Sequence, residues 1–422
     1  MSIVSFADVA FPSVSFDSQE SASQLVLELI DTEWFQRLRD ISQTANTRLV
    51  YMFSEHSRFG HCVGVAFLAK FLLDHLSLSK RDLIEPYRGA VLAAALLHDI
   101  GHLAPGSHTA YKTWFPDAVD IHEELACRII SESTELRSIL ENFDPGTTDT
   151  VCAILREEHD LPPWTWEVIS GGGWNADRGN WCIVDSVLAG VRYGQYNIEA
   201  LVSAIGLSQD GHLILRENRL DAMMHFALSR HAMYRQVYQH RTLMASDTLN
   251  TAIAQRARDL QDKLEFQDPI MRRVLKVTSP FDLSLEELFE MKESWWRYHL
   301  SQWSRSNDSI LADLSQRLLF RRLFKTIRVL HDEDEHDLFQ QAKQAVRQAG
   351  YDPQYYLHRF GLSNMHRGDH RQSMLVLMDD NSVKRMKEAE PLFGALMEQR
   401  EEALRSWIAL PKEAKELLGR ER

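Results

Sequence analysis

The stretch that decides the fold is Gly89-Ala-Val-Leu-Ala-Ala-Ala-Leu-Leu-His98-Asp99-Ile-Gly101-His102. Its first nine residues carry no charge and no strongly polar group, and alanine and leucine are good helix formers. Because a helix that is apolar on all sides is buried on all sides, this stretch predicts the central helix of an α-helical core. Gly101 is expected to end the helix where the chain turns away.

A histidine and an ionisable aspartate, His98 and Asp99, stand at the end of this apolar helix. Burying a lone carboxylate is costly, and a cation bound between the two side chains removes that cost. The pair therefore predicts a metal site at the end of a core helix. By spacing alone a second interpretation is open, because a single His-Asp pair is more often a hydrogen-bonded helix end.

Length and composition are those of an ordinary globular protein. The 422 residues are 44% apolar and 25% charged, and a chain of this length suggests two or three domains. The uncharged runs near residue 90 are too short to cross a bilayer. The first residues, Met1-Ser-Ile-Val-Ser-Phe-Ala-Asp8, lack the basic start of a secretory signal. We therefore expect no membrane partner and a cytoplasmic location.

Net charge and cysteine usage narrow the function further. The net charge of −13 argues against an extended nucleic-acid-binding surface, but it leaves room for a small anionic ligand in one cleft. The four cysteines are scattered and form no Cys-x-x-Cys motif: Cys62, Cys127, Cys152 and Cys182. This usage suits a reducing compartment, where we expect them to be small core residues.

Apolar residues recur at helical spacing along most of the chain, so the fold class is predicted to be mostly α. The helices that matter for the site are expected at residues 57–75, 121–132, 148–158 and 220–245, with a further helix beginning near Trp181. Short strands are expected at residues 13–17, 210–218 and 373–379.

Four residues are candidate metal ligands: His61, His98, Asp99 and Asp185. Two imidazoles and two carboxylates suit a divalent Mn, Fe, Co, Ni or Zn ion. Such a site keeps coordination positions open for water and for a phosphate oxygen, which a hydrolytic metal needs.

Ordered motifs surround these four residues. Phe35-Gln-Arg-Leu-Arg-Asp-Ile-Ser-Gln43 comes first, followed by His56-Ser-Arg58-Phe-Gly-His61 and by Leu97-His98-Asp99-Ile-Gly-His102. Ile183-Val-Asp185 and Arg230-x-x-Met-Tyr-Arg-Gln-Val-Tyr238-Gln-His240 follow. In their order and gaps, these motifs resemble the HD-domain deoxynucleoside triphosphate triphosphohydrolases over residues 30–245. That family includes bacterial dGTPases and the animal dNTPase with a sterile-alpha-motif domain.

The resemblance implies a fold and an activity. We expect a helical HD-domain core with a few short strands in residues 1–265, and a mainly helical region in residues 266–422 that packs on it and offers an oligomer interface. The implied activity is metal-dependent hydrolysis of a (deoxy)nucleoside triphosphate to nucleoside and inorganic triphosphate.

The resemblance also implies a cofactor and partners. The implied cofactor is one divalent ion (Mn, Mg, Fe or Zn), with a further Mg ion accompanying the triphosphate. Implied partners are the nucleotide triphosphate substrate and, in a homo-oligomer, nucleotide effectors. Nucleotide-pool control or defence against phage is the role that it permits.

The resemblance also implies roles for individual residues. The metal ligands are His61, His98, Asp99 and Asp185, and Arg58 contacts the substrate phosphates. The catalytic and triphosphate pocket is lined by His102, His108 and His122, with His108 the first choice to move the proton and Glu123 orienting His122. Sugar, phosphate and base are contacted by Gln43, Arg230, Tyr234, Tyr238 and Gln239. Other interpretations remain open: any one of these histidines can be structural, and Tyr238 can belong to the buried stripe of a long helix.

Downstream of Asp185 the chain departs from the family pattern. The family has a basic residue directly after the aspartate, a tyrosine four residues after it and an acid eight after it, where this chain has Ser186, Ala189 and Tyr193. In the family the tyrosine packs where a ribose 2′-OH would lie and the acid binds the 3′-OH, so selection for deoxynucleotides is in question. Tyr111 stands where an acid commonly supports a catalytic histidine.

Two alternative functions follow from these departures. The first is an HD-type phosphodiesterase or nucleotidase that acts on another nucleotide. The second is a nucleotide-sensing regulatory protein whose catalysis is weak or needs activation. Identification of the products separates the first alternative from the leading hypothesis, and nucleotide-dependent assembly without turnover would favour the second.

Overall fold

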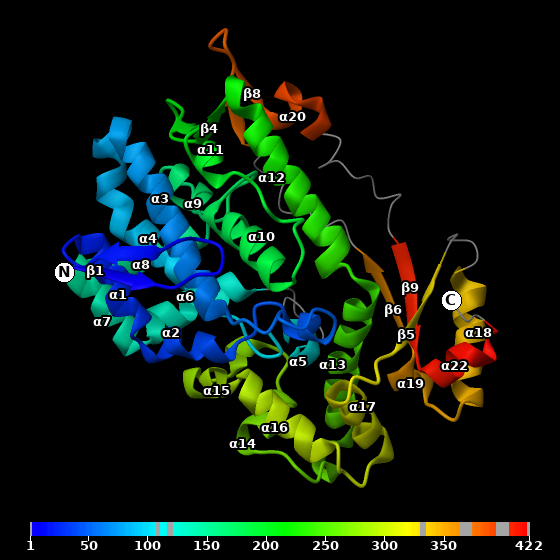
Figure 1. The fold of residues 1–422 in the computed structure, drawn as a ribbon. Coiled ribbons are helices and arrows are strands. Elements are labelled where there is room, and N and C mark those ends of the chain that lie inside the picture. Colours follow the sequence, from blue (N-terminus) through cyan, green and yellow to red (C-terminus); the bar gives the residue numbers. More distant parts are fainter. Residues whose placement is uncertain are drawn as a thin grey trace.

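The computed structural model describes residues 2–106, 110–115, 121–329, 335–362, 374–393 and 405–419. As predicted, these residues are mostly helical, with a few short strands. Figure 1 shows the helices of the N-terminal half gathered on one side, and a small three-stranded sheet with its helices on the other.

The apolar stretch at residue 89 forms the centre of the core. It is helix α4 (Arg88–Leu97), and all ten of its residues are buried. The long helix α3 (Arg58–Ile84) packs along it, and α1 (Ser21–Ile30) and α8 (Thr147–Leu155) also cover it. The prediction of a core helix at this position is confirmed, because alanine and leucine on every face leave no side that solvent could favour.

Two further helices bring side chains to the end of α4. Helix α10 (Ala176–Leu188) packs against α3, and α6 (His122–Glu132) packs against α8 and α7 (Thr134–Phe143). The carboxyl end of α4 and helices α3, α6 and α10 therefore surround one place in the core.

The expected long helix over residues 220–245 is interrupted. Helix α12 (Leu220–Met233) continues into one π-helical turn (Tyr234–Tyr238), and a new helix, α13 (Arg241–Leu260), begins after it. The sequence has no glycine or proline in this interval that would have predicted the break. Single π-turns inside helices are frequent at functional sites.

The strands form three small sheets. β1 (Ile3–Phe6) pairs with β2 (Val14–Asp17), and the second sheet has the order β3 (Ile205–Leu207), β4 (Leu213–Arg216), β7 (Leu375–Leu377), β8 (Val383–Arg385). β7 is parallel to β4, so the C-terminal region completes a sheet that the N-terminal half begins. In the third sheet β9 (Arg405–Leu410) lies between β5 (Lys325–Arg328) and β6 (His358–Leu362), with α18 (Glu335–Gln348) and α22 (Lys412–Leu417) beside it (Figure 1).

The remaining helices are short or belong to the C-terminal half: α2 (Glu33–Arg37), α5 (Ala110–Trp114), α9 (Trp164–Glu167), α11 (Ile198–Val202), α14 (Pro269–Val274), α15 (Leu285–Glu290), α16 (Glu293–Trp303), α17 (Ser309–Leu319), α19 (Pro353–Tyr356) and α20 (Met386–Ala389). The buried Arg37 ties the two halves together, because its guanidinium donates to the carbonyl oxygens of Phe289 at 2.9 Å and His102 at 3.0 Å. The division of the chain at residue 265 stays a prediction.

One segment, Arg58–Leu97, is long and apolar enough to cross a membrane by length and composition alone. It consists of α3, α4 and the short turn between them, and 56% of its most apolar window is buried inside the fold. The packing of this segment in the core therefore explains its apolar composition.

Candidate functional site

A cluster of two imidazoles and two carboxylates lies where α3, α10 and the end of α4 meet. Nε2 of His61, on α3, lies 3.1 Å from Oδ1 of Asp177 and 3.7 Å from Oδ2 of Asp99. Nε2 of His98, just after α4, lies 3.5 Å from Oδ1 of Asp99 and 3.7 Å from Oδ1 of Asp177. One atom each of His61, His98 and Asp177 can be chosen so that all three lie within 4.8 Å of one another.

Three of the four expected ligands are in this cluster, and the fourth, Asp185, is not. Among the described residues, no group of potential ligand atoms within 4.8 Å includes Asp185. Its carboxylate instead accepts a hydrogen bond from Nε2 of His56 at 2.7 Å and another from the hydroxyl of Tyr238. Asp177, in the first turn of α10, lies where Asp185 was expected.

The four side chains fit a divalent cation. Nδ1 of His61 is 2.9 Å from Oδ1 of Asn180 and Nδ1 of His98 is 2.9 Å from the carbonyl oxygen of Ala95, so both imidazoles turn Nε2 toward the carboxylates. Nε2 of His98 is buried and has no hydrogen-bond partner among the described residues. A histidine held through one ring nitrogen, with the other directed at carboxylates, is the usual arrangement of a metal ligand.

Both carboxyl groups in the cluster are held in the ionised form. Burial raises the pKa of Asp177, but the neighbouring imidazoles of His61 and His98 outweigh it and keep that pKa well below its usual range. Burial also raises the pKa of Asp99, and the nearby guanidinium of Arg58 and two histidines lower it further than burial raises it. Arg58, the first residue of α3, is itself buried and donates to Oδ2 of Asp99.

A pair of stacked histidines adjoins the cluster. The rings of His102 and His122 stack with centroids 4.3 Å apart, and Nε2 of His102 lies 3.1 Å from Oδ1 of Asp99. Burial and the charge of Arg58 lower the pKa of His102 well below its usual value, so this imidazole is neutral at pH 7. Oε1 of Glu123 lies 3.4 Å from Nε2 of His122. His108, the first choice for moving the proton, lies outside the described residues.

An aromatic cluster includes Trp181, further along the same helix α10. The rings of Trp181, Tyr234 and Tyr238 meet edge to face, with centroids 5.4 to 5.5 Å apart. The guanidinium of Arg230, near the end of α12, lies 5.4 Å from the ring centroid of Tyr234. The hydroxyl of Tyr238 donates to Asp185, so that carboxylate is in direct contact with the aromatic cluster.

The family pattern fits the sequence better when it is counted from Asp177 than when it is counted from Asp185. Counted from Asp177, the basic residue directly after it is Arg178, the aromatic residue four after it is Trp181, and the acid eight after it is Asp185. The spacing was thus present in the sequence and could have identified Asp177. Ser186 has a structural role, because its Oγ donates to the carbonyl oxygen of Val191 at 2.9 Å.

The other expected site residues have the following contacts. Oε1 of Gln43 is buried and has no hydrogen-bond partner among the described residues, while its N–H donates to the carbonyl of His56 at 3.0 Å. Gln239 directly follows the π-helical turn. Tyr111 is buried and donates to the carbonyl of Gly101 at 2.8 Å. His56 had no predicted role, but its backbone carbonyl accepts from Gln43 and its ring donates to Asp185, so it connects these two residues.

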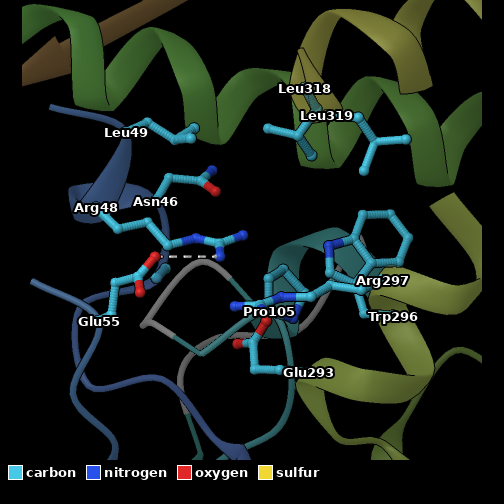
Figure 2. Close-up of a pocket in the computed structure, with 11 residues that line it drawn as sticks. Asn46, Arg48, Leu49, Glu55, Pro105, Glu293, Trp296, Arg297, Leu318 and Leu319 are labelled. Carbon is cyan, nitrogen blue, oxygen red and sulfur yellow. Dashed lines mark ion pairs between the residues drawn. The ribbon is translucent and has the colours of Figure 1, made fainter. Parts of the chain in front are cut away.

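A separate cavity of about 340 Å³ lies between the segment that carries Arg48, the loop at Pro105 and the start of α16 (Figure 2). Arg48 lines it and lies 3.8 Å from the carboxylate of Glu55. Glu293, at the start of α16, also lines it and accepts a hydrogen bond from the N–H of Gly106 at 2.6 Å. The residues that line this cavity include no member of the His-Asp cluster, so the two sites are distinct.

Comparison with known proteins identifies the family. Residues 58–203 match the HD domain. The uncharacterized protein YwfO of Bacillus subtilis is 30% identical over 338 residues, which is 79% of this chain and 75% of that protein. The chain belongs to the HD-domain family. The HD domain holds the cluster described above, since α3, α4, α6 and α10 all lie within the matched residues.

Two further comparisons show a similarity over part of the chain and a similarity of fold. A deoxynucleoside triphosphate triphosphohydrolase SAMHD1 homologue from Dictyostelium discoideum is 30% identical over 140 residues, which is 32% of this chain and 27% of that protein. The chain spans less than half the length of each SAMHD1 relative that it matches. The crystal structure of a phosphohydrolase from Bacteroides thetaiotaomicron has the same fold, with a TM-score of 0.82 at 21% identity over 97% of this chain and all of that one.

Proposed function

We propose that this HD-domain protein hydrolyses (deoxy)nucleoside triphosphates to nucleoside and inorganic triphosphate. The observation that carries the proposal is the position of Asp177 and Asp185 on one helix. Asp177 contacts the two histidines of the candidate metal centre, and Asp185 contacts an aromatic cluster of the kind on which a nucleoside can stack. A phosphate at one end of α10 and a nucleoside at the other fit this arrangement.

The metal ligands in this proposal are His61, His98, Asp99 and Asp177, with Asp177 in place of Asp185. A divalent ion bound there supplies positive charge to a phosphate and lowers the pKa of a bound water. Mn, Mg, Fe and Zn all remain candidates, because two imidazoles and two carboxylates accept each of them. The further Mg ion with the triphosphate stays a prediction from the resemblance.

Arg58 and Arg230 are the proposed phosphate contacts. Arg58 is buried beside Asp99, and its guanidinium can bind two phosphate oxygens at once while opposing the negative charge that builds up during attack. Arg230 is buried beside the ring of Tyr234, and it is the proposed contact of the more distant phosphates.

The stacked histidines are proposed to move the proton. His102 is neutral at pH 7, so it can accept a proton, and His122 lies against it with Glu123 at its edge. A histidine in contact with the reacting group can protonate the leaving 5′-oxygen. His108 keeps this role as the first choice of the resemblance, with His122 as the second.

Trp181 and Asp185 are proposed to select the sugar. With Asp177 as the ligand, Trp181 takes the place of the tyrosine that the family packs where a ribose 2′-OH would lie. Asp185, oriented by His56 and Tyr238, takes the place of the acid that binds the 3′-OH. The departures that motivated a phosphodiesterase or nucleotidase therefore no longer support that alternative, and deoxynucleotides are the expected substrates.

An assay with all eight common deoxy- and ribonucleoside triphosphates tests the proposal. The full chain is incubated with each triphosphate in the presence of Mn or Mg, and the products are separated by ion exchange. Nucleoside and inorganic triphosphate are expected from the deoxynucleotides, and Trp181→Ala is expected to raise activity toward ribonucleotides relative to deoxynucleotides. Release of monophosphate and pyrophosphate, or cleavage of a cyclic or monophosphate nucleotide alone, would refute the proposal.

Regulation by assembly is a separate proposal that comes from the resemblance. A homo-oligomer with nucleotide effectors, built through residues 266–422, predicts that added nucleotides change the molar mass in solution. Light scattering with and without each triphosphate measures this directly. Nucleotide-dependent assembly without turnover would favour the nucleotide-sensing alternative.

A further inference from the structure

Two of the four cysteines face each other across two helices. Cys127 lies on α6 and Cys152 on α8, and their exposed fractions are only 1% and 4%. Each Sγ atom lies 3.7 Å from the carbonyl oxygen of the other cysteine, so the contacts are reciprocal. The hydroxyl of the exposed Ser131 lies 3.5 Å from Sγ of Cys152, which puts the pair just beneath the surface.

The two thiols differ in acidity from each other and from the remaining cysteines. The hydrogen bond from Cys127 lowers the pKa of Cys152 to about 7, and the same contact raises the pKa of Cys127. Burial raises the pKa of Cys62 and of Cys182. Because the thiolate is the form that reacts with oxidants, Cys152 is expected to react first.

Both helices of the pair support the candidate metal centre. Helix α6 begins with His122, and a Cβ atom on Gly101 would lie 2.1 Å from the carbonyl oxygen of His122 and 2.8 Å from the nitrogen of Ala126. The backbone of α6 therefore packs directly on the chain between Asp99 and His102. Helix α8 packs against α4, which ends just before His98.

We propose that Cys127 and Cys152 form a redox-active pair, which a hydroperoxide converts into a disulfide between α6 and α8. The Cys152 thiolate attacks hydrogen peroxide, the O–O bond breaks, and hydroxide leaves as the sulfur becomes a sulfenic acid. The sulfur of Cys127 then attacks that sulfur, the S–O bond breaks, and water leaves as the S–S bond forms. Two thiols are oxidised and one peroxide is reduced. A dithiol reductant reverses the reaction by exchange.

The disulfide is expected to act on the metal centre through α6. Bonded sulfur atoms lie about 2 Å apart, which is closer than two thiols in contact, so the bond draws Cys127 and Cys152 together and is expected to pull α6 toward α8. Since protein interiors are close-packed, a shift of α6 moves His122 relative to His102, on which it stacks at 4.3 Å. Loss of activity on oxidation follows from this shift, and this part of the inference rests on the proposed function.

Peptide mapping tests the linkage without any assay of activity. The full chain, loaded with Mn, is treated with hydrogen peroxide, unfolded in urea with N-ethylmaleimide and digested without reductant. A linked peptide that joins Cys127 and Cys152 is expected, with Cys62 and Cys182 recovered as maleimide adducts, and dithiothreitol before unfolding should abolish the link. Absence of this peptide while Cys152 is oxidised further, or equal oxidation of all four cysteines, would overturn the proposal.

The two single variants are matched controls for each other. In Cys127→Ser the sulfenic acid on Cys152 has no partner thiol, so dimedone should label Cys152. In Cys152→Ser the less acidic Cys127 should remain unlabelled under the same conditions. Equal labelling in both variants would contradict the assignment of Cys152 as the first thiol to react.

The rate of triphosphate hydrolysis measures whether the disulfide affects the candidate metal centre. Oxidised wild-type protein is expected to lose activity several-fold and to recover it with dithiothreitol, whereas Cys152→Ser should lose none. A linked peptide with unchanged turnover would refute the coupling. If the reduced protein shows no triphosphohydrolase activity, the proposed function fails while the peptide map still decides whether the thiol pair exists.

Discussion

At the scale of single residues, Asp177 and Asp185 differ in their partners although they share a helix. Asp177 contacts His61 and His98, which are candidate metal ligands, whereas Asp185 is held by His56 and Tyr238. Eight residues of helix correspond to a rise of about 12 Å, so the two carboxylates cannot serve the same ion. Their substitutions should therefore have separable effects.

Asp177→Asn is expected to lower metal affinity by more than about tenfold, because it removes a charged ligand. Asp185→Asn should bind metal as the wild type does and should raise KM or lower kcat. Metal content after dialysis against a fixed free Mn concentration, measured by mass spectrometry, distinguishes the two variants. If Asp185→Asn loses the metal and Asp177→Asn keeps it, the ligand assignment is wrong.

Gly101 has a role that differs from the expected one of ending the helix. Its φ is not positive, but a Cβ atom there would meet the backbone of α6 at 2.1 Å. We expect Gly101→Ala to lower the free energy of unfolding by about 2 kcal/mol or more, since backbone cannot move aside as a side chain can. Gly60→Ala, inside α3 with nothing within 4 Å, should instead raise it by up to about 1 kcal/mol. Urea unfolding of both variants gives the comparison.

At the scale of elements, the guanidinium of Arg37 holds helix α2 to α15 and to the turn at His102. It donates to the carbonyl oxygens of Phe289, Leu288, Met291 and His102. Burial lowers the pKa of Arg37 to about 10, so the side chain is still charged at pH 7. The C-terminal half therefore positions His102 through one side chain of the N-terminal half.

Arg37→Met is expected to lower the free energy of unfolding by about 3 kcal/mol, because several buried carbonyl groups lose their donor. Arg39→Met, two residues away and exposed, should change it by less than about 1 kcal/mol. Chemical denaturation gives both values. Equal effects of the two substitutions would show that the buried contacts of Arg37 contribute nothing specific.

At the scale of the whole molecule, Asp247 on α13 makes stability depend on pH. Burial raises the pKa of Asp247 to about 7, and the hydrogen bond from Asn46 offsets only part of this. Between the ordinary aspartate pKa of 3.8 and about 7, the folded state keeps a proton that the unfolded state has lost. Stability must therefore fall as pH rises through this window.

Asp247→Asn should remove this contribution. Between pH 4 and 7 the wild type is expected to lose stability relative to the variant as the pH rises. The difference between their free energies of unfolding should change by at most about 1.4 kcal/mol per pH unit. Well above pH 7 the difference should become constant, because Asp247 is then ionised in both the folded and the unfolded state. Denaturation series at several pH values measure it, and a pH-independent difference would contradict the raised pKa.

The sequence by itself determined the helical class and the central helix, because helical periodicity and a run of alanine and leucine report burial locally, whereas the grouping of His61 with His98 and Asp99 was predicted from the resemblance to a known family. The spacing of Arg178, Trp181 and Asp185 after Asp177 fitted the family pattern, but the sequence offered Asp185 as well, and the packing of α10 on α3 decided that the turn with Asp177 faces the cluster. Only the tertiary structure decided the π-helical turn, the pairing of β4 with β7, and the contact between Cys127 and Cys152. The strand pairing and the cysteine contact depend on segments far apart in the chain, whose meeting leaves no local pattern.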